Sequence, residues 1–592
     1  MLDKEIAATF DRRSALFLTG GAVLTGVLLL RMMQLQIFNY KKYHNLSQNN
    51  STRIIIDPPV RGRILDRDGA VLARDDAIYR VFIIPNECDD VAVVLDAVRD
   101  ELKLSDKEIT KIQNKITRNR RFQPVILRDS IKWSQLVKLK ALNIAGLYTE
   151  PGLARKYPGE GIAAHTVGYV GNDEDNRTVR MAITSPFIMS GIAGLEKIFN
   201  EKLSGTPGQI ITHTDALGRV IDTNKEQRIA PTNGKNLQTT LRANVQKKME
   251  EELSEHGAGC GVMIECATGD IIAIASAPSF DANIFRSLDG PEYMEELLKN
   301  KLKPFMNKSI EGLYPPGSTF KIVVALAALE SGAITGKEKI YCDGDWEYGK
   351  HIYHCWEKKG HGWVDLEGAL EHSCDIYFYQ LALKIGINPI KSMAEKLGLG
   401  QKLLNLLPRE MAGVIPNREW KKKNIRASWV HGDTIISGIG QGYILTNCLQ
   451  LAVMGARAAT GREIIPNLIL DTSAPRPQTP DLGLNPKNIK IVMNGLRRVT
   501  GKNGTAYGAG LICPDMGGKT GTAQVRRISM AERKSGVKTN EQLAWEQRNH
   551  GLFVGLAPIN NPKYAVAIIT EHAGGSGIAA RAAARVMKEA LQ

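Results

Sequence analysis

The segment Tyr314–Lys321, which reads Tyr-Pro-Pro-Gly-Ser-Thr-Phe-Lys, constrains the fold of this chain more than any other. Its Pro-Pro-Gly run cannot continue a helix, so it ends whatever element precedes it. The run that follows, Phe320–Glu330, is apolar on nearly every face, which is typical of a helix buried inside a domain. The sequence therefore predicts a buried helix that begins close to Ser318.

Ser318 and Lys321 form a candidate nucleophile and base at the start of this helix. They are three residues apart, which puts both side chains on one helix face and within reach of each other. A neutral lysine there can accept the serine proton and make the serine a nucleophile. The alternative is a helix-capping serine followed by a solvated lysine, because S-x-x-K occurs often by chance. Further motifs must decide between the two interpretations.

Two further clusters follow in the order that such a site requires. Ser373-Cys374-Asp375 lies at a break after a helix-like run, and Lys519-Thr520-Gly521-Thr522 lies on a candidate strand whose glycine would allow a substrate backbone to approach. An S-x-x-K motif, an S-x-N-like triplet and a K-T-G motif, in this order, are the signature of class A β-lactamases and penicillin-binding proteins. The three together favour a serine acyl-transfer site.

The distribution of candidate elements predicts an α+β fold. A chain of 592 residues is long enough for two or more domains. Candidate strands at 260–265 and 271–275 flank a turn, helices dominate from 318 to 460, and further strands and a final helix follow from 518 to 591. This order predicts one antiparallel sheet built from both ends of the C-terminal region, with helices packed on it. Residues 39–235 contain no candidate nucleophile, metal or phosphate site, so they are interpreted as a positioning domain.

One strongly apolar segment, residues 15–38, is interpreted as an uncleaved membrane helix, because no small-residue cleavage site follows it. A buried soluble helix is the alternative. The basic residues on its two sides nearly balance, so charge alone does not orient it. The net charge of +15 is not concentrated on a basic helix or an aromatic-basic ladder, which argues against a nucleic-acid partner.

The chain resembles the class B penicillin-binding proteins along nearly its whole length, and within them the elongation branch, penicillin-binding protein 2. Arg61–Gly69 matches the first pedestal motif of the family, and Gly432–Tyr443 and Asp375 resemble the elongation branch. The resemblance implies a cytoplasmic tail (1–14), a transmembrane helix (15–38), an elongated mixed α/β pedestal or dimerisation domain (39–236) and a transpeptidase domain (237–592). It also implies a single-pass protein of the inner membrane with its catalytic domain in the periplasm.

The resemblance implies transfer of a peptidoglycan stem peptide through a serine acyl-enzyme that β-lactams also form. The catalytic residues would be Ser318 as nucleophile, Lys321 as base, Ser373 as proton relay, and Asp375 and Lys519 beside them, with Thr520, Gly521 and Thr522 binding substrate. Related proteins carry Asn where this chain has Asp375. An Asp carboxylate accepts hydrogen bonds, but it lacks the amide group with which Asn also donates them. The implied partners are stem peptides ending in D-Ala-D-Ala, β-lactams, a SEDS-family glycan polymerase and other proteins of the elongation complex. No organic cofactor is implied.

Other functions remain open at this point. A β-lactam sensor shares the motifs but usually has several membrane segments and a cytoplasmic signalling domain. A hydrolytic β-lactamase needs neither a long pedestal nor an anchor, and a bifunctional enzyme needs a glycosyltransferase domain for which the first 236 residues lack a paired-carboxylate site. A non-catalytic scaffold of the elongation complex is the remaining alternative, and the complete motifs argue against it.

A group of potential metal ligands lies between the first and second motifs. Cys, His and Asp are zinc ligands, and four of them within this stretch can close a tetrahedral structural site. The resemblance implies zinc bound by Asp343, Cys355, His361 and Cys374, with Cys355 standing where relatives have a second Asp. Cys342 is the reserve ligand if Asp343 faces solvent. The alternatives are a disulfide or unrelated buried thiols.

Overall fold

The structure is a computed structural model that describes all residues except 1, 42–51, 119–122, 160, 173–188, 215–219, 288, 472–478, 527–531 and 533–537. The chain divides into two compact units, which are described separately. Unit 1 comprises Met1–Val60 and Gly205–Gly234, and unit 2 comprises Arg61–Ser204 and Lys235–Gln592. Residues 42–51, near the start of the predicted pedestal domain, lie outside the described residues.

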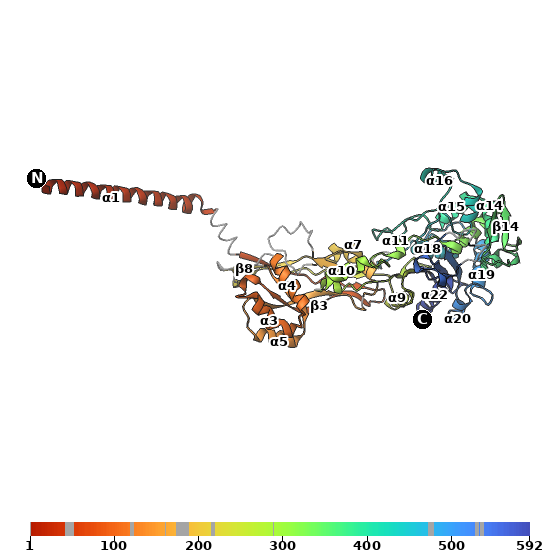
Figure 1. Cartoon of the computed structure of the whole chain (residues 1–592), viewed down its shortest axis with the longest axis horizontal. Coiled ribbons are helices and arrows are strands. Elements are labelled where there is room, and N and C mark those ends of the chain that lie inside the picture. The colour runs from red at the N-terminus through yellow and green to blue at the C-terminus, as the bar shows by residue number, and fades with distance from the viewer. Residues whose placement is uncertain are drawn as a thin grey trace. The chain divides into compact units, whose positions relative to one another are not determined.

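Unit 1 contains the apolar helix and a small sheet (Figure 1). Helix α1 (Leu2–Met33) continues as a π-helical turn, η1 (Gln34–Phe38). The stretch Ser14–Phe38 is long and apolar enough to cross a membrane, and none of it is buried against other residues. Within the described part of the chain, the exposure of this segment argues against the alternative of a buried soluble helix. The sheet has the antiparallel order β1-β8-β9, with bounds Thr52–Asp57, Gly208–Thr214 and Val220–Ile229.

The N-terminal part of unit 2 is a mixed α/β structure built on one long strand, β3 (Val71–Ile83). A hairpin forms at Gly69 between β2 (Ile64–Leu65) and β3, and Gly69 has a φ of 90°, which glycine adopts without strain. The other strands of this part are β4 (Val125–Ile131) and β5 (Leu147–Lys156), both paired with β3, and β6 (Val170–Asn172), β7 (Met189–Gly191) and β10 (Leu237–Gln238). Its helices are η2 (Pro85–Glu87), α3 (Val91–Leu102), α4 (Asp106–Arg118), α5 (Trp133–Ala141), α6 (Ala164–Val167), α7 (Gly194–Ile198) and α8 (Asn200–Ser204). Strand β10 lies directly after the domain boundary predicted at residue 236, and it pairs with β2, which lies before that boundary. The boundary at residue 236 stays a prediction.

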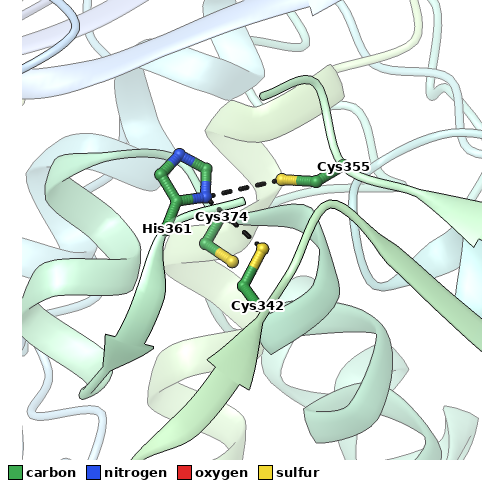
Figure 2. Close-up of side chains that lie close together, drawn as sticks. All are labelled: Cys342, Cys355, His361 and Cys374. Atoms are coloured by element: carbon green, nitrogen blue, oxygen red, sulfur yellow. Dashed lines mark hydrogen bonds between the residues drawn. The ribbon is translucent and has the colours of Figure 1, made fainter. Parts of the chain in front are cut away.

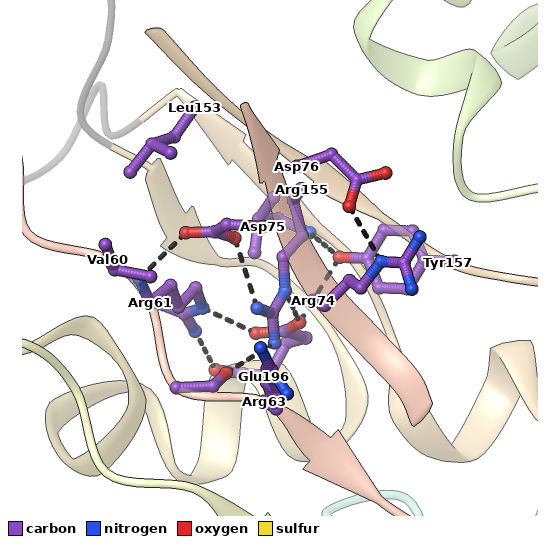
Figure 3. Close-up of polar contacts among 12 residues, drawn as sticks. Val60, Arg61, Arg63, Arg74, Asp75, Asp76, Leu153, Arg155, Tyr157 and Glu196 are labelled. Atoms are coloured by element: carbon purple, nitrogen blue, oxygen red, sulfur yellow. Dashed lines mark hydrogen bonds and ion pairs between the residues drawn. The ribbon is translucent and has the colours of Figure 1, made fainter. Parts of the chain in front are cut away.

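A buried ion network holds the start of this region together (Figure 3). The carboxylate of Glu196 accepts from Arg61 Nε and from Arg155 Nε, at 2.7 Å in each case. Arg155 also pairs with Asp75 at 3.2 Å, and Tyr157 donates to Glu196 at 3.4 Å. All of these side chains are buried and have lost contact with water. The opposite charges and hydrogen bonds of the network must therefore compensate the cost of desolvation. Arg61, the first residue of the pedestal motif, is therefore a structural residue.

Replacing Glu196 by glutamine is expected to destabilise unit 2 by about 3–5 kcal/mol, because two buried guanidinium groups would lose the charge that compensates them. Urea unfolding of the solubilised protein measures the loss of stability, which appears as a lower urea concentration at the unfolding midpoint. Glu201→Gln on the adjacent helix α8 is the matched control, since that side chain is exposed and the substitution should leave the midpoint unchanged. Equal midpoints for Glu196→Gln and wild type would mean that the network contributes nothing to stability.

The C-terminal part of unit 2 is built on a five-stranded antiparallel sheet of order β12-β11-β19-β18-β17, as the sequence predicts. The bounds are β11 (Gly259–Glu265), β12 (Ile271–Ala277), β17 (Gly517–Ala523), β18 (His550–Ala557) and β19 (Tyr564–Thr570). Alternate residues face two separate cores, since Val262 belongs to one hydrophobic cluster and Met263 to the other. Helices α9 (Ala243–Ser254) and α22 (Ser576–Leu591) cover one face, and α18 (Cys448–Thr460) covers the other.

Helix α12 (Lys321–Glu330) is buried up to Leu329, as predicted for its apolar sequence. Further helices belong to the C-terminal part of unit 2. They are η3 (Ile284–Arg286), α10 (Gly290–Lys299), α11 (Lys308–Glu311), η4 (Gly317–Phe320), α13 (Leu366–Glu371), α14 (Asp375–Ile385), α15 (Ile387–Lys396), α16 (Arg418–Asn424), α17 (His431–Ser437), α19 (Pro486–Val499), α20 (Tyr507–Ile512), η5 (Asn540–Gln542) and η6 (Trp545–Gln547).

Four short strands interrupt the region that was predicted to be helical. They pair as β13 (Ile340–Cys342) with β16 (Gly362–Val364), and β14 (Asp345–Tyr348) with β15 (His351–His354). Strands of this length carry too few residues to establish a period of two in the sequence. Three of the predicted metal ligands, Asp343, Cys355 and His361, lie directly beside these strands, whereas Cys374 lies at the start of α14.

Candidate active site

Ser318 lies in the single 3-10 turn η4, directly before α12. The Pro-Pro-Gly run ends the preceding chain as predicted, and Gly317 takes a φ of 54° at the turn. A Cβ atom at Gly317 would lie 2.7 Å from the carbonyl oxygen of Thr522, so only glycine lets the turn approach strand β17 this closely. The first and third motifs are thereby held against each other.

Lys321 is fully buried, which excludes the alternative of a solvated lysine. Its Nζ donates to the Ser373 carbonyl at 2.8 Å, to Ser373 Oγ at 3.2 Å and to Asp375 Oδ1 at 2.7 Å. Three acceptors match the three protons of a lysine ammonium. The structure thus joins the first motif to the second through Lys321.

The second motif is held in an unusual backbone conformation. Ser373 has a φ of 55°, in the left-handed region that residues other than glycine seldom adopt. Cys374 follows as the N-cap residue of α14, and its backbone N–H donates to the Ala369 carbonyl at 2.9 Å. This turn points both the carbonyl and the hydroxyl of Ser373 toward Lys321. Strain of this kind is common at functional sites.

Lys519 on β17 is the second buried lysine of the site. Burial, and then the positive charge of Lys321, hold the pKa of Lys519 well below its usual range, while Asp375 opposes this shift. Its Nζ donates to the Thr520 carbonyl at 3.2 Å. Asp375 therefore bonds to one lysine of the site, Lys321, and acts on the other, Lys519, only through its charge.

The predicted substrate-binding residues lie along β17. Thr520 is buried and its hydroxyl contacts Thr505 Oγ1 at 2.8 Å, whereas Thr522 is half-buried. A Cβ atom at Gly521 would lie 2.9 Å from the Pro316 carbonyl oxygen. Gly521 therefore lets the turn before Ser318 approach this strand closely. Their roles in binding substrate stay predictions.

A contact that the sequence analysis did not identify supports this strand. Gln441 Nε2 donates to the Thr522 carbonyl at 3.2 Å, and the Gly440 carbonyl accepts from Gly317 N at 3.0 Å. Both residues belong to the Gly432–Tyr443 stretch that resembles the elongation branch. This stretch therefore supports η4 and β17 together.

Beside the second motif, Cys342, Cys355, His361 and Cys374 converge (Figure 2). Their ligand atoms all lie within 4.8 Å of one another, and His361 Nδ1 is 3.6 Å from both Cys342 Sγ and Cys355 Sγ. The three sulfur-bearing residues are buried, and all the cysteines of the chain are free thiols. Three thiols and one imidazole at these distances fit the donor set of a tetrahedral structural zinc site.

The three cysteine thiols of the cluster differ in their pKa values. Hydrogen bonding from Cys374, with a further contribution from His361, lowers the pKa of Cys342 to about 6 and that of Cys355 to about 3. Against the effect of burial, the Cys355 and Cys342 sulfurs raise the pKa of His361 to about 9. The same hydrogen bonds raise the pKa of Cys374 well above its usual range. Cys342 and Cys355 are therefore the thiols that most readily form thiolates, the form that binds metal.

The structure places Cys342, the reserve ligand of the sequence analysis, in the cluster in place of Asp343. Asp343 is exposed, and its carboxylate lies outside the cluster, accepting from the backbone N–H of Asp345 at 3.3 Å. Cys342 takes its place, since it ends β13 with its side chain turned inward. Successive residues of an extended chain point to opposite sides, so these two neighbours cannot both face the cluster.

Comparison with known families agrees with the three motifs. The family described as Penicillin binding protein transpeptidase domain matches residues 259–592, and the Penicillin-binding Protein dimerisation domain matches residues 56–239.

Relatives match along nearly the whole chain. Peptidoglycan D,D-transpeptidase MrdA of Acinetobacter baumannii is 31% identical over 96% of this chain and 86% of that protein. MrdA of Escherichia coli K12 is also 31% identical, over 96% of this chain and 92% of that protein.

Solved structures agree. PBP2 of Helicobacter pylori in complex with MreC has a TM-score of 0.75 at 26% identity, covering 91% of this chain and 98% of that one. PBP2 of Pseudomonas aeruginosa in complex with WCK 5153 has a TM-score of 0.66 at 30% identity, covering 91% of this chain and 97% of that one. The chain therefore belongs to the penicillin-binding protein transpeptidase family, within its PBP2 group.

Proposed function

We propose that this chain is the peptidoglycan D,D-transpeptidase of cell-wall elongation. The observation that carries this function is the convergence of the three motifs on one buried lysine. Lys321 bonds to Ser373 and Asp375, and the turn that contains Ser318 contacts the strand that contains Lys519. The MrdA relatives, which are peptidoglycan D,D-transpeptidases by name, match over nearly the whole length.

The acylation step assigns one role to each motif residue. Ser318 Oγ attacks the carbonyl carbon of the penultimate D-Ala, and the peptide bond to the terminal D-Ala breaks. Lys321, in its neutral form, accepts the serine proton, and Ser373, whose Oγ lies 3.2 Å from Lys321 Nζ, relays a proton to the leaving amine. An amine of a neighbouring stem peptide then displaces Ser318 and forms the crosslink.

The remaining residues of the site stabilise charge. Backbone N–H groups of Ser318 and Thr522 are assigned to the oxyanion, and the hydroxyls of Thr520 and Thr522 to the substrate carboxylate. Lys519, which is buried, is assigned to orienting Ser373. A β-lactam, which resembles D-Ala-D-Ala, acylates Ser318 by the same step.

Mass spectrometry of the protein after exposure to a fluorescent penicillin tests this function. The adduct is expected on the peptide that contains Ser318, and a pentapeptide substrate is expected to lose its terminal D-Ala. A protein that forms no adduct would instead be the non-catalytic scaffold. A released, hydrolysed penicillin at high turnover would indicate a β-lactamase.

For the membrane helix we propose a single crossing of the inner membrane, with residues from 39 onward in the periplasm, where stem peptides are crosslinked. The expected partners there are a SEDS-family glycan polymerase and other elongation proteins. A PBP2 neighbour is solved with MreC, and another neighbour belongs to a peptidoglycan synthase complex.

Alkaline phosphatase fused to the C-terminus is expected to be active in cells, because this enzyme folds only where its disulfides form. The same fusion placed after residue 12, before the apolar segment, is the matched control and should be inactive. Activity of a cytoplasmic reporter at the C-terminus would contradict the proposed topology.

For the Cys/His cluster we propose a structural zinc ion held by Cys342, Cys355, His361 Nδ1 and Cys374. Four protein ligands leave no open position, so the ion would neutralise the buried thiolates and would not activate water. It would tie β13 and the loop after β15 to the second motif. Elemental analysis of protein purified without chelator should give about one zinc per chain. A disulfide between two of these cysteines, found by non-reducing peptide mapping, would exclude the metal.

A further inference from the structure

Asp375 uses both of its carboxylate oxygens within the protein. Oδ1 accepts from Lys321 Nζ at 2.7 Å, and Oδ2 accepts from the backbone N–H of Trp356 at 3.0 Å. The side chain is nearly buried, so few water molecules can replace either bond. The residue therefore faces two donors and offers no donor of its own to a substrate.

Trp356 belongs to the loop that leads from β15 to β16, directly after Cys355. A second bond ties this loop to the same motif, since Trp356 Nε1 donates to the His372 carbonyl at 3.0 Å. A third bond runs the other way, from the backbone N–H of Asp375 to Cys355 Sγ at 3.4 Å. The loop and residues 372–375 thus form one hydrogen-bonded unit.

We propose that Asp375 is a positioning residue that fixes Lys321 relative to the loop carrying Cys355 and Trp356. The position of the base would then depend on the Cys/His cluster through one carboxylate, without any contact between the cluster and the substrate. The proposal rests on the proposed function, because it assigns Lys321 as the base.

The geometry explains why Asp occupies a position where related proteins carry Asn. An asparagine has one acceptor oxygen and one amide donor, whereas this site presents a donor on each side. With Asn, the amide group would face either the Lys321 ammonium or the Trp356 N–H, and a buried donor would lose its partner. Lys321 would then be free to shift away from Ser373.

Acylation kinetics of the full chain with a fluorescent penicillin test the proposal. Asp375→Asn is expected to lower the acylation rate at saturating penicillin about 10²-fold, the cost of a small misplacement of a reacting group, while the half-saturating concentration changes little. Asp365→Asn is the matched control: Asp365 caps α13 by accepting from Gly368 N, has no contact with Lys321, and should acylate as wild type. Wild-type acylation by a folded Asp375→Asn protein would overturn the proposal.

A double-mutant cycle tests the connection to the loop. Cys355→Ala alone is expected to slow acylation. In the Asp375→Asn background the same substitution is expected to slow acylation by less than a further twofold, because each change on its own already frees Lys321 from the loop. If the double variant slows acylation by the product of the two single effects, the loop and Lys321 act independently, and the proposal is overturned.

Amide hydrogen exchange of the wild-type chain tests the Trp356–Asp375 bond directly, and it does not depend on whether a variant folds. The Trp356 amide is expected to be protected, and rapid exchange there would remove the bond on which the proposal depends. None of these outcomes alters the penicillin adduct on Ser318 in the wild type, so failure of this inference is distinct from failure of the proposed function.

Discussion

Ser318→Ala is expected to abolish covalent labelling by penicillin and all transfer of stem peptides, while the protein remains folded. Loss of a serine nucleophile costs acyl-transfer enzymes on the order of 10⁶ in rate. The substitution removes one half-buried hydroxyl that makes no hydrogen bond with another described side chain, so stability should change little. Gel fluorescence and thermal melting measure the two effects.

The matched control is Ser331→Ala at the other end of the same helix. Ser331 Oγ donates to the Ala328 carbonyl at 3.0 Å and lies far along α12 from the motif residues. Labelling should be unchanged in this variant. A Ser318→Ala protein that still carries an adduct would show that another residue is the nucleophile.

Cys374→Ser is expected to lower the melting temperature and to slow acylation together. The residue lies inside the second motif, so its loss both opens the proposed zinc site and loosens Ser373. Loss of a metal ligand should cost several kcal/mol, and each kcal/mol lowers the melting temperature by roughly 2–4 °C in domains of 150–250 residues. Bound zinc should fall in parallel.

Cys88→Ser controls for the change of sulfur to oxygen, because Cys88 is a half-buried thiol of the pedestal region that donates to the Ile84 carbonyl at 3.5 Å. It should keep wild-type zinc content, melting temperature and acylation rate. A Cys374→Ser protein with normal acylation and a lowered melting temperature would mean that the cluster stabilises the fold without positioning the site.

The sequence alone determined the local parts of the site. The Pro-Pro-Gly run followed by an apolar stretch predicts a turn and a buried helix, and both form at Gly317–Glu330. The strands β11, β12, β18 and β19 also follow from short apolar runs between turn residues, whereas β17, with the sequence Gly-Gly-Lys-Thr-Gly-Thr-Ala, has no such run. These features depend on neighbours in the chain, so pattern and turn chemistry are sufficient to predict them.

The tertiary structure decided which side chains meet. Cys342 and Asp343 are adjacent in sequence, and only the pairing of β13 with β16 determines which of them faces the cluster. A three-residue strand has no periodicity from which its inward face can be read. The two-sided contact of Asp375 likewise depends on Trp356 and Lys321, which lie on separate elements. Residue type therefore predicts the chemistry of this protein, whereas the packing of distant segments determines which atoms carry it out.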